Sequence, residues 1–495
     1  MSSDAQVLTV AGATIPNDRV RVADLWARSG VQDVCEAAIE MEANGFAIDV
    51  PYFDAQAAVA ERDLDAVRAR LRDLVPPDWP ETDAGADAIW TSPKQLVRLL
   101  HDEDRFALPP SPVRKKGAVR LDDGDRSTDA AALEWVAEHA AEGPGRDVVR
   151  GVLELRKVTS SLKYLRKLPQ YVAPDGLVHP VCGPAGDGDD RVGALTGRFG
   201  MKNPEAQQIP RDKRKDAYHL RRGFVAPPGM LLVVRDYTAL EVVVAANMAN
   251  WFWGDRQLLD LTAPGVDIHA HNARNVFGRL LGWVTPSGRR LADAAPDEFK
   301  TDPELAWYRD AIKAVWYKLQ YGGTPHGFAT SLRGQDGEPV GLARATEIVD
   351  ALYEAVPAVP RLGELTDALL RRDGGVCSVG GRFADYRYLL EQDDPRRPEK
   401  NWGFQKASRK AKNFPMQAMG AEVIGRAMVA AVRSPELRRL GALLEKQVHD
   451  ELGWRVPAEG AERASAIADE IMSGAYPLEN LRTAGGIGPN WEDAK

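Results

Sequence analysis

Apolar residues recur with helical spacing in two long segments near the start of the chain, residues 54–75 and 147–170. Neither segment contains an internal proline before Pro169, so each is expected to form one long helix, and the two helices to pair antiparallel. The stretch between them from Leu108 to Asp129 is rich in Pro, Gly and Asp. This composition predicts a mobile connection at the far end of the helix pair.

A second pattern places aspartates beside short strands. Residues 231–241 read LLVVRDYTALE, a strand-like apolar run that ends at Asp236 and continues into the helix-like sequence EVVVAANMANW. Far downstream, residues 447–454 read QVHDELGW, in which Asp450 interrupts a strand-like alternation. Either aspartate alone is more often a turn or capping residue. A pair that converges on folding is what two hard cations require in metal-dependent phosphoryl transfer.

Between these segments, residues 309–322 read RDAIKAVWYKLQYG. Two cations and two aromatics recur there at every fourth position, which places them along one side of a helix: Arg309, Lys313, Tyr317 and Tyr321. An ordinary amphipathic helix with a charged edge would show the same pattern. Alternatively, the cations hold a triphosphate, an aromatic packs on sugar and base, and Gly322 ends the helix. The flanking aspartate motifs favour the nucleotide interpretation.

With these motifs in this order, the chain resembles the family A DNA polymerases, the group typified by bacterial DNA polymerase I. DYTALE at 236–241 is similar to motif A, RDAIKAVWYKLQYG at 309–322 to motif B, and VHDE at 448–451 to motif C. Further matching segments are SPKQLVRLL from Ser92, TGRFGMKNPEAQQIP from Thr196, DIHA from Asp267 and KNFPMQAMGAEVIGRAM from Lys412. The ending GIGPNWEDAK is similar to the family's usual C-terminus, so we expect the polymerase domain to stop there.

The resemblance implies an α+β multidomain fold of the right-hand polymerase type, with a palm built on an antiparallel sheet and with helical fingers and thumb. The expected parts are an N-terminal extension (1–30), the thumb and N-terminal part of the polymerase domain (31–175), palm with motif A (176–265), fingers with motif B (266–400), and palm with motif C and the C-terminus (401–495). Family members often carry an upstream 3′–5′ exonuclease domain. We find no counterpart and expect no intrinsic proofreading.

The same resemblance implies that Asp236 and Asp450 bind two Mg²⁺ ions, for which Mn²⁺ could substitute, and that the carbonyl of Tyr237 faces a metal. Lys313 would be catalytic, because it could neutralise or protonate the leaving pyrophosphate, and it would grip the incoming phosphates. Arg309 and His269 would bind the phosphates as well. Tyr321 would stack near the templating base beside Gly322, although an aromatic at a helix end often simply packs.

Glu241 matches the family glutamate that leaves no room for a 2′-hydroxyl, which implies deoxynucleotide substrates. Tyr317 matches a position where a Tyr hydroxyl substitutes for the missing 3′-hydroxyl of a chain terminator, so we expect weak discrimination against dideoxynucleotides. Six residues match positions that hold the primer-template near its 3′ end, partly through minor-groove acceptors that report pairing geometry. They are Arg198, Gln207, Arg409, Asn413, Gln417 and His449. The cationic run at 211–222 would suit a phosphate backbone, or would be a solvated face.

Several positions depart from the family pattern, among them His326, which replaces a usual aromatic. Ala239 and Val243 stand where the family commonly has Gln and Arg, so two polar contacts are lost after motif A. Lys318 stands where the family generally has Gly, which adds a long cationic side chain to the fingers helix.

Composition fits an intracellular enzyme. The chain has 495 residues, 44% apolar and 27% charged, enough for several domains with sizeable cores. Cys35, Cys182 and Cys377 lie far apart and indicate neither a disulfide framework nor a zinc site. No apolar run approaches the roughly 20 residues of a membrane span. We therefore expect a bacterial cytoplasm, including that of a phage-infected cell. The net charge of −8 does not exclude nucleic acid, because binding depends on where cations cluster.

The expected partners are primer-template DNA and dNTPs, with a processivity factor or a separate exonuclease as further candidates, and the expected process is DNA replication or repair. A single-subunit RNA polymerase would share the two aspartates, but Glu241 and Glu451 argue against it. A catalytically silent DNA-binding replication scaffold would not need Asp236, Asp450, Arg309 and Lys313 together. Reverse transcription, translesion synthesis, and phage or host origin stay open.

Overall fold

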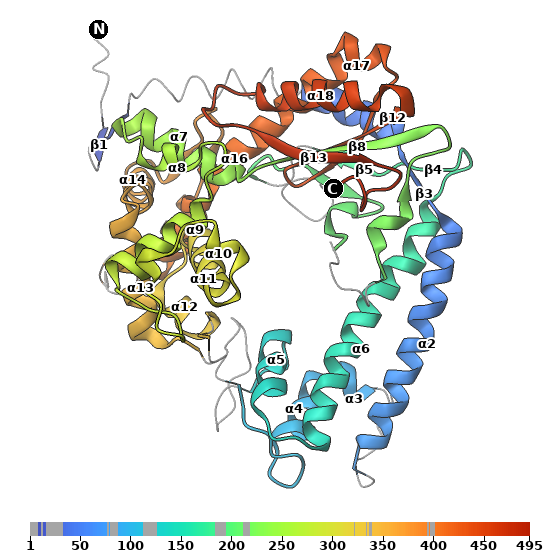
Figure 1. Cartoon of the computed structure of the whole chain (residues 1–495), viewed down its shortest axis with the longest axis vertical. Coiled ribbons are helices and arrows are strands. Elements are labelled where there is room, and N and C mark those ends of the chain that lie inside the picture. The colour runs from blue at the N-terminus through green and yellow to red at the C-terminus, as the bar shows by residue number, and fades with distance from the viewer. Residues whose placement is uncertain are drawn as a thin grey trace.

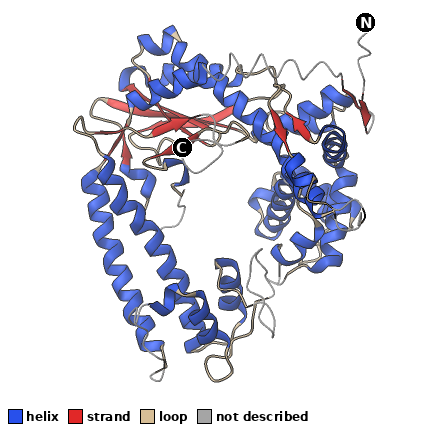
Figure 2. Ribbon diagram, turned by 180° about the vertical axis from the view of Figure 1, so that it is seen from behind, coloured by secondary structure: helices blue, strands red, loops and turns tan. Residues whose placement is uncertain are grey.

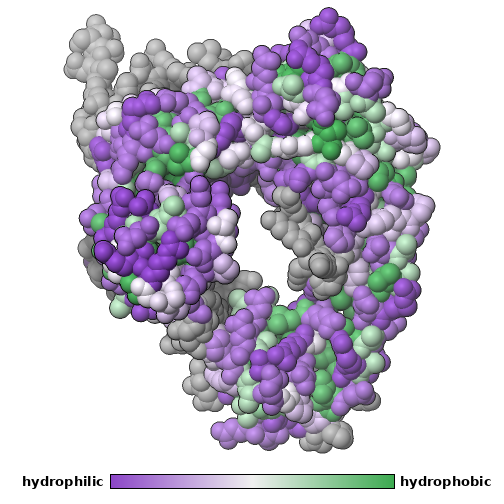
Figure 3. All heavy atoms as spheres, viewed as in Figure 1, coloured by the Kyte–Doolittle hydropathy of each residue, from purple (hydrophilic) through white to green (hydrophobic). Residues whose placement is uncertain are grey.

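The computed structural model describes residues 8–10, 13–15, 33–76, 79, 88–111, 126–183, 195–210, 218–320, 322–332, 334–335, 339–393, 396 and 401–495. A sheet with covering helices lies at one end, and two mainly helical arms extend from it on either side of an opening (Figures 1 and 2). The space-filling view shows the same opening, bordered mostly by hydrophilic residues on the visible face (Figure 3).

One arm is built on the two long helices that the apolar spacing predicts. They are α2 (Val50–Leu74) and α6 (Pro144–Lys167), so both predictions are confirmed to within a few residues. Arg166 near the end of α6 pairs with Glu61 in the first half of α2 at 2.5 Å, and Gly151 near the start of α6 lies against Leu71 near the end of α2. The helices are therefore antiparallel, as predicted.

Shorter helices form the tip of this arm: α3 (Ala88–Thr91), α4 (Pro93–His101) and α5 (Ala130–His139). Most of the predicted mobile connection between Leu108 and Asp129 lies outside the described residues. At the other end of α6, a 3₁₀ turn over Leu168–Tyr171 contains Pro169, which cannot donate a helical hydrogen bond.

The central sheet contains β8 (Met230–Tyr237), β11 (Leu443–Val448), β12 (Glu451–Pro457) and β13 (Thr483–Gly488). The strands are antiparallel in the order β11-β12-β8-β13, and the register places Glu451 opposite Asp236. The helices α16 (Trp402–Arg433), α17 (Pro435–Arg439) and α18 (Ala461–Ser473) lie on one side of this sheet (Figure 1). The other face of the sheet is directed towards the opening.

Aromatic packing joins the base of the long helices to the central sheet. The small sheet β4-β3-β7 consists of Leu177–Val178, Phe46–Ile48 and Phe224–Val225. Phe224 packs against Phe46, Phe53 and Trp491, with ring centroids 5.3, 6.0 and 5.2 Å apart. Since such rings bury large apolar areas, this cluster fixes where the arm leaves the sheet.

The second arm is helical and lies between β8 and β11 in the sequence. After α7 (Leu240–Trp253) it contains α8 (Gln257–Leu261), α9 (Ile268–Ala273), a π-helical segment (Arg274–Leu280), α10 (Glu298–Thr301), α11 (Pro303–Gln320), α12 (Pro325–Ser331), α13 (Gly341–Ala355), α14 (Ala358–Asp373) and α15 (Arg387–Leu390). The remaining strands pair as the hairpins β1 (Leu8–Val10) with β2 (Ala13–Ile15), β5 (Val181–Gly183) with β6 (Gly200–Lys202), and β9 (Gly375–Cys377) with β10 (Phe383–Asp385). The domain boundaries drawn from the sequence stay predictions.

Helix α11 ends as its sequence predicts. Gly322 has φ +70° and its N–H donates to the carbonyl of Leu319 at 2.9 Å. A Cβ at Gly322 would lie 3.1 Å from the Cα of Arg409 on α16, so this close approach also favours glycine. Tyr321 lies outside the described residues.

A buried carboxylate joins α16 to the β9–β10 hairpin. Glu422 is 0% exposed, and Ser378 Oγ donates to its Oε1 at 2.8 Å. Its Oε2 has no hydrogen-bond partner within the described parts of the chain, and a Cβ at Gly380 would lie 1.7 Å from it. Burial raises the pKa of Glu422 to about 7, although the Ser378 hydrogen bond and the charges of Arg382 and Arg426 act in the opposite direction.

We therefore expect Glu422→Gln to make the protein more stable at alkaline pH. A raised pKa means that folding favours the neutral carboxyl, so this contribution is complete below the ordinary value of 4.5 and is lost as the pH rises through about 7. The loss amounts to about 3 kcal/mol at most. Urea unfolding at pH 5.5 and 8.5 measures the free energy of unfolding. The difference between the variant and the wild type should change in favour of the variant at the higher pH. The exposed Glu347→Gln serves as the control, and identical pH dependence of wild type and Glu422→Gln would contradict the prediction.

Candidate active site

The sheet register brings the two predicted aspartates together. Asp236 lies near the end of β8, and Asp450 lies in the turn that joins β11 to β12. The backbone N–H of Tyr237 donates to the carbonyl of Asp450 at 3.0 Å, which ties this turn to β8. His449 in this turn has φ +57°. This left-handed conformation is uncommon for residues other than glycine and is typical of a tight turn. The predicted convergence is therefore confirmed.

A cavity of about 270 Å³ opens between these strands and α11. Its lining includes the predicted site residues Asp236, Tyr237, Glu241, Tyr317, His449 and Asp450. Motifs A, B and C thus contribute to one cavity, as their order in the sequence predicts. Arg221 and Lys495, which the sequence reasoning did not single out, also line it.

Negative charge is concentrated in this cavity. The pKa of Asp450 is raised to about 6, chiefly by burial; the neighbouring carboxylates Glu241 and Asp236 act in the same direction, while Arg198 and Lys495 oppose them. Ionisation of such a carboxylate is unfavourable when no cation is present. A bound cation stabilises the charged form, so the carboxylate is a good cation ligand. The electrostatics at Asp450 therefore suit a divalent metal ion.

Tyr237 is held firmly at the end of β8. Its hydroxyl donates to the carbonyl of Met472 on α18 at 2.8 Å, and burial raises the pKa of the phenol. The anchored ring fixes the backbone beside Asp236. The side chain of Tyr237 is therefore structural.

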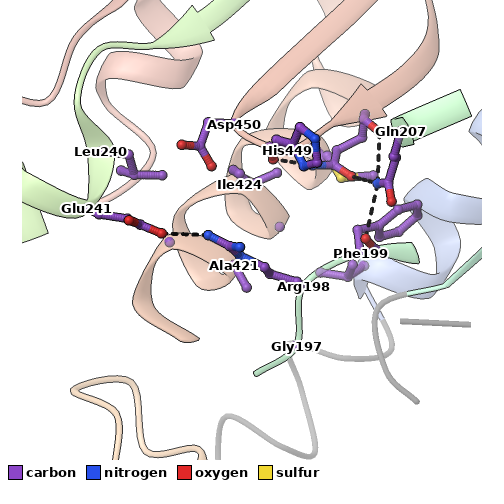
Figure 4. Close-up of a pocket in the computed structure, with 15 residues that line it drawn as sticks. Gly197, Arg198, Phe199, Gln207, Leu240, Glu241, Ala421, Ile424, His449 and Asp450 are labelled. Atoms are coloured by element: carbon purple, nitrogen blue, oxygen red, sulfur yellow. Dashed lines mark hydrogen bonds and ion pairs between the residues drawn. The ribbon is translucent and has the colours of Figure 1, made fainter. Parts of the chain in front are cut away.

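A second, smaller cavity of about 40 Å³ adjoins the first and is shown in Figure 4. Arg198 and Glu241 point towards each other there, with Arg198 Nη2 2.6 Å from Glu241 Oε1. Glu241 is only 9% exposed, so the ion pair fixes a nearly buried carboxylate. Gln207 donates to the carbonyl of Phe199 at 3.1 Å and to Gln447 Oε1 at 2.9 Å.

Gln447 in turn donates to the carbonyl of His449, so Gln207 is connected to the motif C turn through this glutamine. Burial lowers the pKa of the His449 imidazole, and the charges of Arg198 and Arg221 lower it further. Of the six predicted DNA contacts, the structure therefore brings Arg198, Gln207 and His449 together around one cavity.

The cationic side of α11 is organised by an aspartate in the second arm. Asp267 caps α9 by accepting from the backbone N–H groups of His269 and Ala270 at 3.0 and 3.1 Å. Its other oxygen binds Arg309 Nε at 2.9 Å and Lys300 Nζ at 3.1 Å. Burial alone would raise the pKa of Asp267, but the hydrogen bonds from Ala270, Arg309 and Lys300 lower it to about 2. Asp267 is thus a permanent anion that orients Arg309.

His269 contacts the first cavity through Tyr317, with ring centroids 5.7 Å apart. Burial lowers the pKa of His269 to about 4; Lys313 and Arg309 lower it too, while Asp267 opposes them. The imidazole is therefore neutral near pH 7 and would bind a phosphate as an N–H donor. The side chain of Lys313, one turn from Arg309, is exposed.

The three remaining predicted DNA contacts are spaced by four residues along α16: Arg409, Asn413 and Gln417. The Oδ1 atom of Asn413 is buried and has no hydrogen-bond partner within the described residues. A buried amide oxygen without a donor is costly, so this position favours a polar ligand. These side chains do not line either cavity described above.

Two arginines of the cationic run at 211–222 contact residues near the end of the chain. Arg221 lies 4.0 Å from the ring centroid of Trp491, and Arg222 pairs with Glu492 at 3.1 Å. Residues 211–217 lie outside the described part of the chain. At the described end of this run, Arg221 is therefore buried against Trp491, whereas Arg222 is exposed and forms a surface ion pair.

Sequence reasoning missed Lys495, Arg221 and the orienting role of Asp267. An Asp immediately before a short helix is a common capping signal, so Asp267 could have been found. No local pattern marks Lys495, whose Nζ lies 2.8 Å from Asp236 Oδ2.

The structure also shows the surroundings of the residues that depart from the family pattern. Lys318 Nζ donates to Ser331 Oγ at 2.7 Å and lies 5.6 Å from the ring centroid of Phe328, which ties α11 to α12. Ala239 starts α7 in a left-handed conformation, with φ +52°, and Val243 is buried.

The side chains at this site supply only some of the ligands that a divalent metal ion needs. Asp236 and Asp450 supply carboxylate oxygens, the donors that Mg²⁺ prefers. Across the described ranges, no group of three or more His, Cys, Asp or Glu side chains is arranged to hold a metal. Backbone, water and substrate oxygens would have to complete the coordination, which is usual for Mg²⁺ at phosphate-transferring sites.

Comparison with known proteins agrees with this arrangement. A family model described as DNA polymerase family A matches residues 81–296 and 298–493. The chain belongs to this family, as its motifs predict.

Two relatives illustrate the extent of the match. The thermostable DNA polymerase I of Thermus thermophilus is 30% identical over 474 residues, which cover 95% of this chain and 49% of the relative. DNA polymerase I of Mycobacterium bovis is 28% identical over 459 residues, 92% of this chain and 43% of the relative. The chain thus spans about half the length of the curated relatives it matches.

A solved structure described as the POL domain of Pol1 from M. smegmatis, in complex with DNA primer-template and dNTP, is similar with a TM-score of 0.75. It is 23% identical, and the match covers 96% of this chain and 72% of that one. The predicted α+β right-hand polymerase fold is therefore confirmed.

Cys35, Cys182 and Cys377 are free cysteines in the structure. None of the described helices has the length and apolar character needed to cross a membrane.

Proposed function

We propose that the protein is a DNA-directed DNA polymerase that adds deoxynucleotides to a primer 3′ end on a DNA template. The observation that carries this proposal is the single cavity lined by Asp236, Asp450, Glu241 and Tyr317. Membership of DNA polymerase family A supports it. A solved structure of similar fold is described with primer-template and dNTP, which supports the same two partners here.

The carboxylates of Asp236 and Asp450, with the carbonyl of Tyr237, would hold two Mg²⁺ ions, or Mn²⁺ in their place. When bound, the ions would supply charge neutralisation at the attacking 3′ oxygen and at the leaving phosphate oxygen. The protein's own part is to fix Asp236 near the end of β8 and Asp450 in the neighbouring β11–β12 turn, so that little reorganisation is needed during the reaction.

The cationic side of α11 would bind the triphosphate. Asp267 orients Arg309 towards a fixed position, and neutral His269 would add a hydrogen-bond donor. Lys313 would act at the leaving pyrophosphate, either as a charge or as a proton donor. Positioning and charge neutralisation are the main contributions to phosphoryl transfer.

Glu241 would select deoxynucleotides by filling the space of a 2′-hydroxyl, because its ion pair with Arg198 keeps the carboxylate in place. The primer-template would lie along Arg198, Gln207, Arg409, Asn413, Gln417 and His449, with Tyr321 and Gly322 beside the templating base. Such a duplex would enter the opening between the arms (Figure 3).

We also propose synthesis without intrinsic 3′–5′ proofreading, in replication or repair in a bacterial cytoplasm, including that of a phage-infected cell. A separate exonuclease or a processivity factor would then be a partner.

The test is extension of a labelled DNA primer on a DNA template with Mg²⁺. Parallel reactions contain dNTPs, ribonucleotides, an RNA template, or a primer with a mismatched 3′ end. We expect extension with dNTPs on DNA, little with ribonucleotides, and no removal of the mismatch. Efficient ribonucleotide or RNA-template use would favour the RNA polymerase or reverse transcriptase alternatives. DNA binding without extension would favour the silent scaffold.

Tyr317→Phe should increase discrimination against dideoxynucleotides. Tyr317 lines the cavity, where its hydroxyl would substitute for the missing 3′-hydroxyl of a chain terminator. Loss of one neutral hydrogen bond corresponds to a change of up to about ten-fold in relative incorporation. Competition between a dideoxynucleotide and its dNTP on one template measures the ratio. An unchanged ratio, with normal dNTP use, would show that the hydroxyl has no such role.

A further inference from the structure

The side chain of Lys495 reaches into the acidic cavity from the end of the described chain. Its Nζ lies 2.8 Å from Asp236 Oδ2 and also pairs with Glu451 Oε2. Because Glu451 lies opposite Asp236 in the β12–β8 register, one ammonium group bridges carboxylates on two adjacent strands. Lys495 has no part in the chemistry proposed above.

The two carboxylates that Lys495 contacts differ in their surroundings. The side chain of Glu451 is 1% exposed, and its Oε1 accepts a hydrogen bond from Trp491 Nε1 at 2.6 Å. The side chain of Asp236 is 33% exposed and lines the cavity. A buried carboxylate requires a counter-charge, whereas a partly exposed one does not. Glu451 therefore has the stronger need for Lys495.

A divalent cation at Asp236 would compete directly with Lys495. Both cations use the same carboxylate oxygens, and an ammonium group a few ångströms from a metal ion repels it. The contact with Glu451 offers Lys495 a second anion to which it can remain bound. Movement of Nζ away from Asp236 would thus leave no buried charge unpaired.

We propose that Lys495 is a displaceable counter-cation of the metal site. It pairs with both Asp236 and Glu451 when no metal is bound, and it withdraws to Glu451 when a divalent ion binds Asp236. This inference rests on the proposed function, because it requires a divalent ion at Asp236. Its consequence is a lower affinity for metal in the absence of nucleotide than the two aspartates alone would give.

The test measures Mn²⁺ binding without DNA or nucleotide, from the electron paramagnetic resonance signal of free Mn²⁺. Lys495→Met removes the competing charge and should bind Mn²⁺ more tightly than wild type by up to about five-fold, the upper end of the range for a partly exposed ion pair. Lys495→Arg keeps the charge and should resemble wild type. Lys94→Met removes an exposed lysine on α4 and controls for net charge.

Unchanged or weaker Mn²⁺ binding by Lys495→Met would overturn the inference. Because Glu451 loses its counter-charge in that variant and the fold could suffer, the same comparison is made between Glu451→Gln and Glu451→Gln/Lys495→Met. Tighter binding by the double variant is expected there too, and equal binding would overturn the inference. Wild-type binding that Asp236→Asn does not weaken would instead overturn the proposed metal site, and the inference with it.

Discussion

Asp450→Asn is expected to abolish primer extension while the protein still folds and binds primed DNA. The asparagine keeps the shape of the side chain but cannot supply the charge that a metal ion requires. Metal ions contribute several kcal/mol to this kind of transition state, so the rate should fall roughly a thousand-fold or more. Single-turnover extension under saturating primer-template measures the rate, and fluorescence anisotropy of a labelled duplex measures binding.

The fold should tolerate this change because Asp450 is unfavourable to ionise in the metal-free protein. Its pKa is raised to about 6, chiefly by burial, so a neutral side chain removes an unfavourable charge near pH 7. We expect the melting temperature of metal-free Asp450→Asn to equal or exceed that of wild type. Asp260→Asn on α8, an exposed position, is the matched control and should leave extension unchanged. Extension by Asp450→Asn within ten-fold of wild type would contradict the proposed role.

Features with a strong local pattern could be predicted from the sequence. The helices α2, α6 and α11 show regular apolar spacing over several turns, and Gly322 marks where α11 ends. The passage from β8 into α7 is visible as a change from a strand-like to a helix-like pattern. These elements depend on interactions between residues close in sequence, which is why periodicity finds them.

Convergence of Asp236 and Asp450 could not be obtained from spacing alone. It depends on the pairing of β12 with β8, which joins segments far apart in the chain. The family resemblance supplied this information. It did not supply Lys495, because the ion pair with Asp236 depends on where the last described residues pack against the sheet.

Electrostatic states were also beyond the reach of the sequence. His269 was expected to help hold phosphates, and the sequence did not show that burial and the cations of α11 lower its pKa and keep it neutral near pH 7. Arg198 and Glu241 were assigned to DNA binding and sugar selection separately, whereas the structure pairs them at 2.6 Å. Since residues that share an ion pair are not energetically independent, substitution of Arg198 should affect sugar selection as well as DNA binding.

Lys313→Ala is the second change expected to reduce the rate of primer extension strongly. Lys313 lies one helical turn after Arg309, and its removal leaves the ion pair between Arg309 and Asp267 intact. Loss of one group that stabilises developing charge typically slows a reaction by about 10²–10³-fold. Lys313→Arg keeps the charge but is a poor proton donor, so its rate separates neutralisation from protonation of the leaving group. Lys318→Ala, which removes a cation that bonds to Ser331, is the matched control on the same helix. A rise in the dNTP concentration needed for half-maximal rate, with an unchanged maximal rate, would mean that Lys313 binds the substrate and transition state equally and is not catalytic.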